Sequence, residues 1–140
     1  MEGTAPASPA YDAREVMPVV SYQEMTPMDC LAVLRAVSVT RAAFTDGVRP
    51  YVVPMAFRLD AEGLTPVVCL CMPAEGRKEE CLRACPQVCL EFESPACAWV
   101  EVVLLEGRAQ LTDWAQGEGL IVRVRAEQLS GRRFFLQEDG

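Results

Sequence analysis

The chain has 140 residues, carries a net charge of −7 and is 51% hydrophobic, which suits a single domain with one core. The negative charge disfavours general nucleic-acid binding, because an acidic surface repels phosphate backbones. No apolar run is long enough to cross a membrane, and the first residues lack the basic cluster of a signal peptide. We therefore expect a soluble cytoplasmic protein that binds neither nucleic acid nor membranes.

The sequence contains seven cysteines and no histidine. An odd number of cysteines without a secretory signal argues against a disulfide framework, so reduced thiols are expected. Histidine is the commonest general base and metal ligand. Its absence excludes Ser-His-Asp, Cys-His and His-metal mechanisms within one chain.

Residues 1–24 are expected to form a flexible N-terminal arm, because their first ten positions are small, polar and rich in proline. Residues 25–140 are expected to form one domain. Its first element is a helix over 27–36, in which Thr26 is a good N-cap and Pro27 suits the first helical position.

The rest of the domain reads mainly as short strands separated by turn residues. A second helix is predicted over 77–84. Pro54 cannot donate a hydrogen bond to a sheet, so its strand should lie at an edge or carry a bulge. The segment 67–72 is apolar throughout, which predicts a strand buried on both faces. The predicted strands are 37–44, 51–59, 67–72, 88–93, 99–105, 108–111 and 120–125. About six or seven short strands with two short helices predict a mainly β fold, a closed or nearly closed barrel.

Two segments carry a family resemblance. The first runs from Val39 to Phe57 and contains VTRAAF, DG and RPYVVPMAF; the second is GRK at 76–78 followed by PQVCLEFE at 86–93. GRA at 107–109 and SGR at 130–132 are weaker matches. In this order, over about residues 25–133, the set resembles the FMN-binding split-barrel family. It is most similar to the pyridoxamine 5'-phosphate oxidase-like branch, which includes nitroimidazole-resistance proteins.

The resemblance implies a split β-barrel that forms a homodimer with FMN between the subunits. It implies phosphate binding at the start of the second helix, where basic side chains follow Gly76 and a helix N-terminus attracts anions. It also implies that the backbone of 54–57 faces the flavin ring, with the neighbouring strand in reach. The candidate cofactor-binding residues are Thr40, Arg41, Pro54, Met55, Ala56, Phe57, Cys71, Arg77 and Lys78.

Cys71 stands where many relatives in the nitroimidazole-resistance branch have a histidine. It is either a flavin contact or a small hydrophobic residue on a buried strand. Neither a catalytic residue nor a substrate is indicated by the sequence.

Three functions stay open. The leading one is a flavin-dependent oxidoreductase of unknown substrate, in which FMN performs the electron chemistry. The second is a non-catalytic flavin-binding or storage protein. The third is a cysteine-metal protein, suggested by the four-residue spacing of Cys81, Cys85 and Cys89, although this spacing does not match common zinc or iron–sulfur motifs.

Overall fold

The computed structural model describes residues 20–73, 76–96, 98–113 and 119–136. The first nineteen residues of the predicted arm lie outside this part of the chain. The elements in chain order are β1 (Val20–Glu24), α2 (Pro27–Ala36), β2 (Val39–Thr45), β3 (Pro50–Ala56), β4 (Arg58–Glu62), β5 (Thr65–Pro73), α3 (Arg77–Ala84), β6 (Gln87–Pro95), β7 (Trp99–Asp113) and β8 (Gly119–Leu136).

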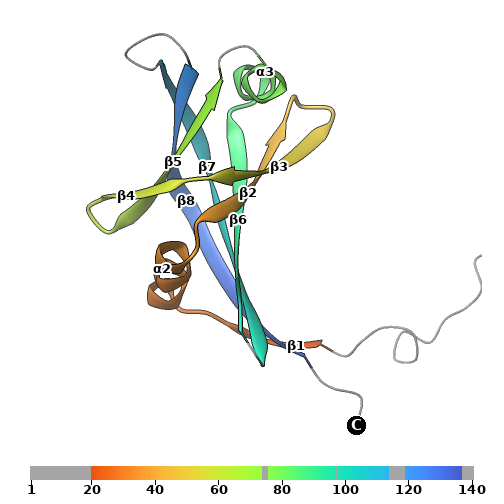
Figure 1. The fold of residues 1–140 in the computed structure, drawn as a ribbon, viewed down its shortest axis with the longest axis vertical. Helices are drawn as coiled ribbons and strands as arrows, with labels where there is room; N and C mark the ends of the chain where they lie inside the picture. Colours follow the sequence, from red (N-terminus) through yellow and green to blue (C-terminus); the bar gives the residue numbers. More distant parts are fainter. Residues whose placement is uncertain (1–19, 74–75, 97, 114–118, 137–140) are drawn as a thin grey trace, which may run out of the picture.

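The strands form one antiparallel sheet in the order β3-β2-β6-β7-β8-β5-β4, and β1 pairs with the far end of β8. The two end strands, β3 and β4, are not hydrogen-bonded to each other, so the described sheet is not closed. The long strands β7 and β8 run through the whole molecule (Figure 1). The prediction of a mainly β, split-barrel-like fold is confirmed. The described chain has eight strands, rather than six or seven, and the barrel is open.

The core lies on the inner face of this curved sheet. Alternate residues of each strand point inward, as the period of two requires. Phe44 and Phe92 are among the largest fully buried side chains, and Leu70, Leu105 and Val122 are 0% exposed. The sheet therefore supplies most of the apolar contacts, with the two helices closing the open parts of the core.

Helix α2 matches its predicted bounds, and its N-terminus is capped as expected. The backbone N–H of Asp29 donates to Thr26 Oγ1 at 3.2 Å. Cys30, Val33 and Leu34 are buried, and their spacing places them on one face of the helix. Helix α3 also matches its predicted range, burying Cys81 and Leu82. Neither described helix has the length and apolar composition needed to cross a membrane.

Four of the predicted strands differ substantially in their bounds from the strands of the structure. The predicted strand 51–59 divides at Phe57, because β3 pairs with β2 whereas β4 pairs with β5. The two strands predicted around Gly107 are one strand, β7, with an irregular register between Glu106 and Gly107.

The last strand extends well beyond its predicted end at Arg125. Its continuation to Leu136 is paired with β7 and β1. The charged residues of this continuation have partners there. Arg133 Nη2 donates to Glu101 at 2.9 Å, and the Arg132 guanidinium lies 4.5 Å from the centre of the Tyr22 ring.

We expect Gly107→Ala to lower the free energy of unfolding by about 1–3 kcal/mol, the usual cost of overpacking. A Cβ at this position would overlap the backbone carbonyl oxygen of Arg125, which the β7–β8 pairing holds in place. Chemical denaturation followed by circular dichroism would measure the loss. Gln110→Ala, at an exposed position of the same strand, is the control. Equal stability of the two variants would contradict the predicted overlap with the Arg125 carbonyl oxygen.

Candidate functional site

A cleft of about 560 Å³ opens between β3, β4, β5, β8 and α3. This volume falls within the range of about 300–1,000 Å³ typical of small-molecule sites. The cleft is lined by Pro54, Met55, Ala56, Phe57, Arg58, Cys69, Cys71, Lys78 and Ile121. Six of the nine candidate cofactor-binding residues are therefore brought together here.

The floor of the cleft is the outer face of β5 and β8. Val68, Leu70 and Met72 of β5 belong to the core, so Cys69 and Cys71 point to the opposite face. Cys71 pairs with Ile121 in the sheet register. Cys69 is buried, whereas Cys71 is exposed. The prediction that this strand is buried on both faces therefore fails at Cys71.

One wall of the cleft is the end of β3. This strand pairs only with β2 in the described sheet, so one of its edges is left without a strand partner, as Pro54 predicted. Met55 is 9% exposed and packs into the core. The Phe57 ring packs edge-on against the ring of Phe92, with centroids 5.0 Å apart. Pro54 and Ala56 remain exposed on the wall.

The two basic residues at the start of α3 take different positions. Lys78 is half-buried and lines the cleft, whereas the exposed Arg77 lies with its guanidinium 4.5 Å from the centre of the Tyr51 ring. Consecutive helical residues point about 100° apart. Arg77 and Lys78, which were predicted to bind the phosphate together, therefore point in different directions. Arg77 does not line this cleft.

Thr40 and Arg41 also lie away from the cleft. The Thr40 side chain is fully buried, and its Oγ1 donates to the Glu91 carbonyl at 2.9 Å. Arg41 Nη1 donates to Glu93 at 2.8 Å and to Glu91 at 3.0 Å. These hydrogen bonds, the one to Glu93 first, raise the pKa of Arg41. Arg41 lines a separate hollow of about 290 Å³.

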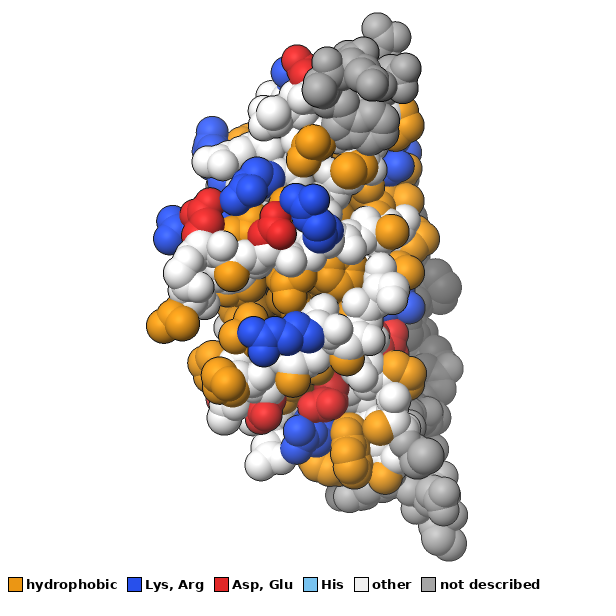
Figure 2. Space-filling model, turned by 60° about the vertical axis from the view of Figure 1, so that its left-hand side comes forward, with side chains coloured by type: hydrophobic (Ala, Val, Ile, Leu, Met, Phe, Trp, Pro, Cys, Tyr) orange, Lys and Arg blue, Asp and Glu red, His pale blue; other side chains and the backbone are white. Residues whose placement is uncertain are grey.

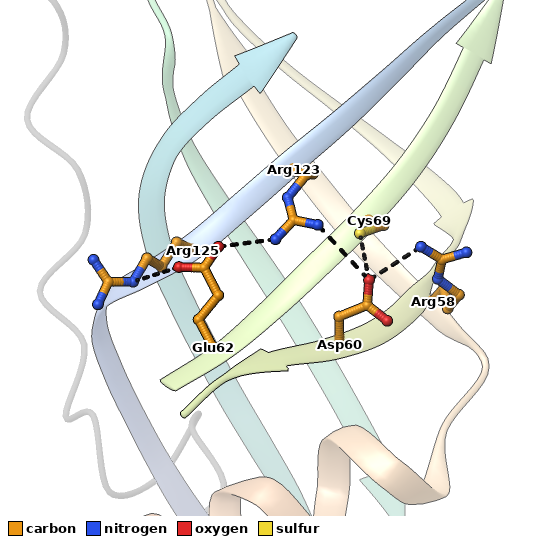
Figure 3. Close-up of polar contacts among 6 residues, drawn as sticks. All are labelled: Arg58, Asp60, Glu62, Cys69, Arg123 and Arg125. Carbon is orange, nitrogen blue, oxygen red and sulfur yellow. Dashed lines mark hydrogen bonds and ion pairs between the residues drawn. The ribbon is translucent and has the colours of Figure 1, made fainter. Parts of the chain in front are cut away.

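Next to the cleft, charged side chains of β4 and β8 form a network on the same outer face (Figure 3). Arg58 Nη2 donates to Asp60 at 3.0 Å, and the Cys69 thiol donates to the same carboxylate at 3.3 Å. Farther along, Glu62 accepts from Arg123 Nη2 at 2.9 Å and pairs with Arg125 Nε at 3.3 Å. In Figure 2, basic and acidic side chains gather beside one another, with hydrophobic side chains directly below them.

This network changes the proton affinity of its members, and the hydrogen bond to Asp60 raises the pKa of Arg58. The hydrogen bond from Arg58, and then that from Cys69, lowers the pKa of Asp60. Burial, followed by the Asp60 carboxylate, raises the pKa of Cys69. Cys69 is therefore held as a neutral thiol at neutral pH, and it does not offer a thiolate to the cleft.

Sequence reasoning missed three lining residues, Arg58, Cys69 and Ile121. Alternation within the segments 67–72 and 120–125 was a usable signal, since it places every second residue on the outer face. The pairing of these two segments was not visible in the sequence, because either could have paired elsewhere.

The third hypothesis, a metal site formed by cysteines, finds little support in the described residues. Among the described residues, no group of three or more Cys, Asp or Glu side chains is placed to hold a metal. Cys81 is buried in α3, and Cys85 and Cys89 are half-buried. Cys97 lies outside the described residues.

The fold has many counterparts among solved structures. No family model matches the chain, and no curated protein matches it either. An FAD-binding protein from Mesorhizobium loti has a TM-score of 0.71 and 21% identity, over 83% of this chain and 98% of that chain. A candidate 5-nitroimidazole antibiotic resistance protein from Bacteroides thetaiotaomicron has a TM-score of 0.75 and 16% identity, over 84% and 90%. The chain has the split-barrel fold of these proteins.

A candidate pyridoxamine 5'-phosphate oxidase from Corynebacterium glutamicum shares this split barrel with a TM-score of 0.69 and 17% identity, over 84% of this chain and 96% of that chain. The structural neighbours thus include flavin-binding, nitroimidazole-resistance and pyridoxamine 5'-phosphate oxidase-like proteins, in agreement with the sequence resemblance. At these identities, the likeness establishes the fold.

We expect Cys69 to be alkylated at a higher pH in the folded split barrel than in the urea-denatured chain, because burial and Asp60 raise its pKa. Asp60→Asn should move the folded profile toward lower pH. Iodoacetamide labelling against pH, resolved by peptide mass spectrometry, measures both. Asp29→Asn, a charge change near Cys30, should leave Cys69 unchanged. Identical folded and denatured profiles would refute the assignment.

Proposed function

We propose that the protein binds a flavin, FMN, in the cleft between β3, β5 and α3, and that it is a flavin-dependent oxidoreductase. The observation that carries the proposal is this cleft of about 560 Å³, with Lys78 on one side and the free edge of β3 on another. The fold supports it, since two structural neighbours, from Mesorhizobium loti and Mycobacterium smegmatis, are described as FAD-binding proteins.

The residues at the α3 side fit a phosphate group. The N-cap residue, Gly76, has no side chain that could cap the helix, and backbone N–H groups at a helix N-terminus are suited to bind an anion. Lys78 adds a cation at the cleft. The first turn also contains Glu79 and Glu80, which oppose an anion. Glu79 pairs with Arg83 at 2.8 Å, and this ion pair reduces the repulsion between Glu79 and a bound anion.

The middle of the cleft fits a flat ring with polar edges. Ile121 and Cys71 form an apolar floor. The unpaired edge of β3 leaves backbone groups without a strand partner, and backbone N–H and C=O groups are strong hydrogen-bonding partners. Arg77 would join the phosphate site by leaving the Tyr51 ring.

FMN, when bound, supplies electron transfer through its ring. The chain's own residues would bind and orient it. Lys78 would neutralise the phosphate, the β3 edge would position the ring, and Cys69 would stay protonated beside it. None of the nine described lining residues is His, Asp or Glu, so no side-chain general base is assigned.

That lining also favours a second candidate, a flavin-binding protein without catalytic activity. Anaerobic mixing of the flavin-loaded protein with a reduced nicotinamide cofactor separates the two functions. Loss of the oxidised-flavin absorbance after mixing supports the oxidoreductase, whereas an unchanged spectrum supports binding alone.

A homodimer is part of this proposal. Val39 and Val52, on neighbouring strands β2 and β3, are 52% and 60% exposed, and both end strands of the sheet are open. A two-fold interface would cover such surfaces. Light scattering at micromolar concentration should give twice the 15.4 kDa of one chain. A mass of one chain would contradict the dimer.

We expect Lys78→Ala to weaken FMN binding about ten- to hundredfold, because a charge-assisted hydrogen bond to phosphate is lost. Riboflavin, which has no phosphate, should lose much less affinity. Fluorescence titration with both flavins measures the difference, and Lys78→Arg should restore most of it. Equal losses for the two flavins would mean general damage to the cleft, and no loss for FMN would place the phosphate elsewhere.

A further inference from the structure

We propose that the cleft has a second ligand subsite at its Arg58 side, and that this subsite receives a small organic anion bearing a carboxylate or phosphate. The anion would be the substrate or electron donor that meets the flavin, so this inference rests on the proposed function. It assigns a substrate class and a residue that recognises it.

The first observation is the charge of the lining. Among the nine described lining residues, two are basic, Arg58 and Lys78, and none is acidic. The whole chain carries a net charge of −7. A cleft lined by one sign of charge concentrates ligands of the opposite sign, so a cationic cleft in an acidic protein selects for anions.

The second observation is that the two cations come from different elements. Lys78 belongs to α3, and Arg58 begins β4; in Figure 1, α3 lies above β4. The flavin phosphate needs the α3 side, where the helix N-terminus adds its donors. Arg58 is then left for the anionic group of another molecule.

The third observation is the way in which Arg58 is held. Its Nη2 donates to Asp60, and its side chain is 73% exposed. Figure 3 shows the other terminal nitrogen directed away from Asp60. A guanidinium has five N–H donors, so one hydrogen bond orients the group and leaves donors for a carboxylate or phosphate.

The charged network around Arg58 also has a positive net charge. Asp60 is itself engaged by the Cys69 thiol at 3.3 Å and lies 4.0 Å from Arg123. Three arginines share the two carboxylates of this network, which leaves it one positive charge in excess. The members are Arg58, Arg123, Arg125, Asp60 and Glu62.

One test uses Cys71, the exposed thiol that lines the same cleft as Arg58 and Lys78. At low ionic strength, the ratio of its alkylation rates by anionic iodoacetate and neutral iodoacetamide should exceed that of free cysteine. Arg58→Gln should lower this ratio about fivefold, the effect of one nearby unit charge, and Arg58→Lys should largely restore it. Arg35→Gln, an equal charge change at an exposed position of α2, is the control. A ratio unchanged by Arg58→Gln would overturn the inference.

A second test uses the flavin-loaded protein. Benzoate should perturb the flavin absorbance at lower concentration than benzamide, its neutral analogue, and Arg58→Gln should remove the preference without changing FMN affinity. Equal binding of the two probes would overturn the anion subsite and leave flavin binding intact. Loss of the preference for FMN over riboflavin in Arg58→Gln would assign Arg58 to the flavin phosphate instead, which also overturns it. If FMN does not bind, the proposed function fails, and the alkylation ratio still decides the subsite.

Discussion

The contact between Phe57 and Phe92 determines where the cleft is built. Phe57 is the single residue between β3 and β4, and these strands pair at opposite ends of the sheet order. Its ring packs edge-on against the fully buried ring of Phe92, 5.0 Å between centroids. The chain is thereby fixed to the core at the point where it crosses from one end of the sheet to the other. Five of the nine lining residues, 54–58, lie at this crossing.

The outer face of β5 and β8 is the second condition for the site. These strands place Leu70 and Val122 in the core, so their neighbours must point outward. The outward residues of β5 and β8 that line the cleft, Cys69, Cys71 and Ile121, are thiol or apolar side chains, whereas Arg123 and Arg125 on the same face of β8 are charged. The same alternation that buries the core thus produces a floor for a flat ligand and, beside it, an electrostatic network.

Local patterns in the sequence predicted much of the fold. Helix α2 was predictable because its cap and apolar spacing are both local, and Pro54 indicated an edge strand because proline lacks an N–H group. The division at Phe57 was not predictable. The segment 51–59 has continuous β character, and only pairing with two different partners separates it. The end of β8 was missed for a related reason, since Arg132 and Arg133 look solvent-exposed until Tyr22 and Glu101 are placed beside them.

The residues of the site were also predictable only where a local sequence motif marks them. The motif residues of 54–57, with Cys71 and Lys78, converge on one cleft, whereas Arg77 does not. Helical geometry sends the two adjacent basic side chains in different directions, and a sequence motif does not resolve that choice. Arg58 had no motif to mark it, and its position depends on the strand crossing.

Strand β8 links the parts of the molecule that lie farthest apart. It pairs with β5 through residues 119–125, with β1 through residues 132–136, and with β7 along almost its whole length. A single residue inserted in its middle would turn every later side chain to the opposite face. The aromatic and arginine residues of its far end would then change places across the sheet. The length of this strand is therefore constrained as strictly as its composition, and variation in chain length among proteins of this architecture should concentrate in the turns.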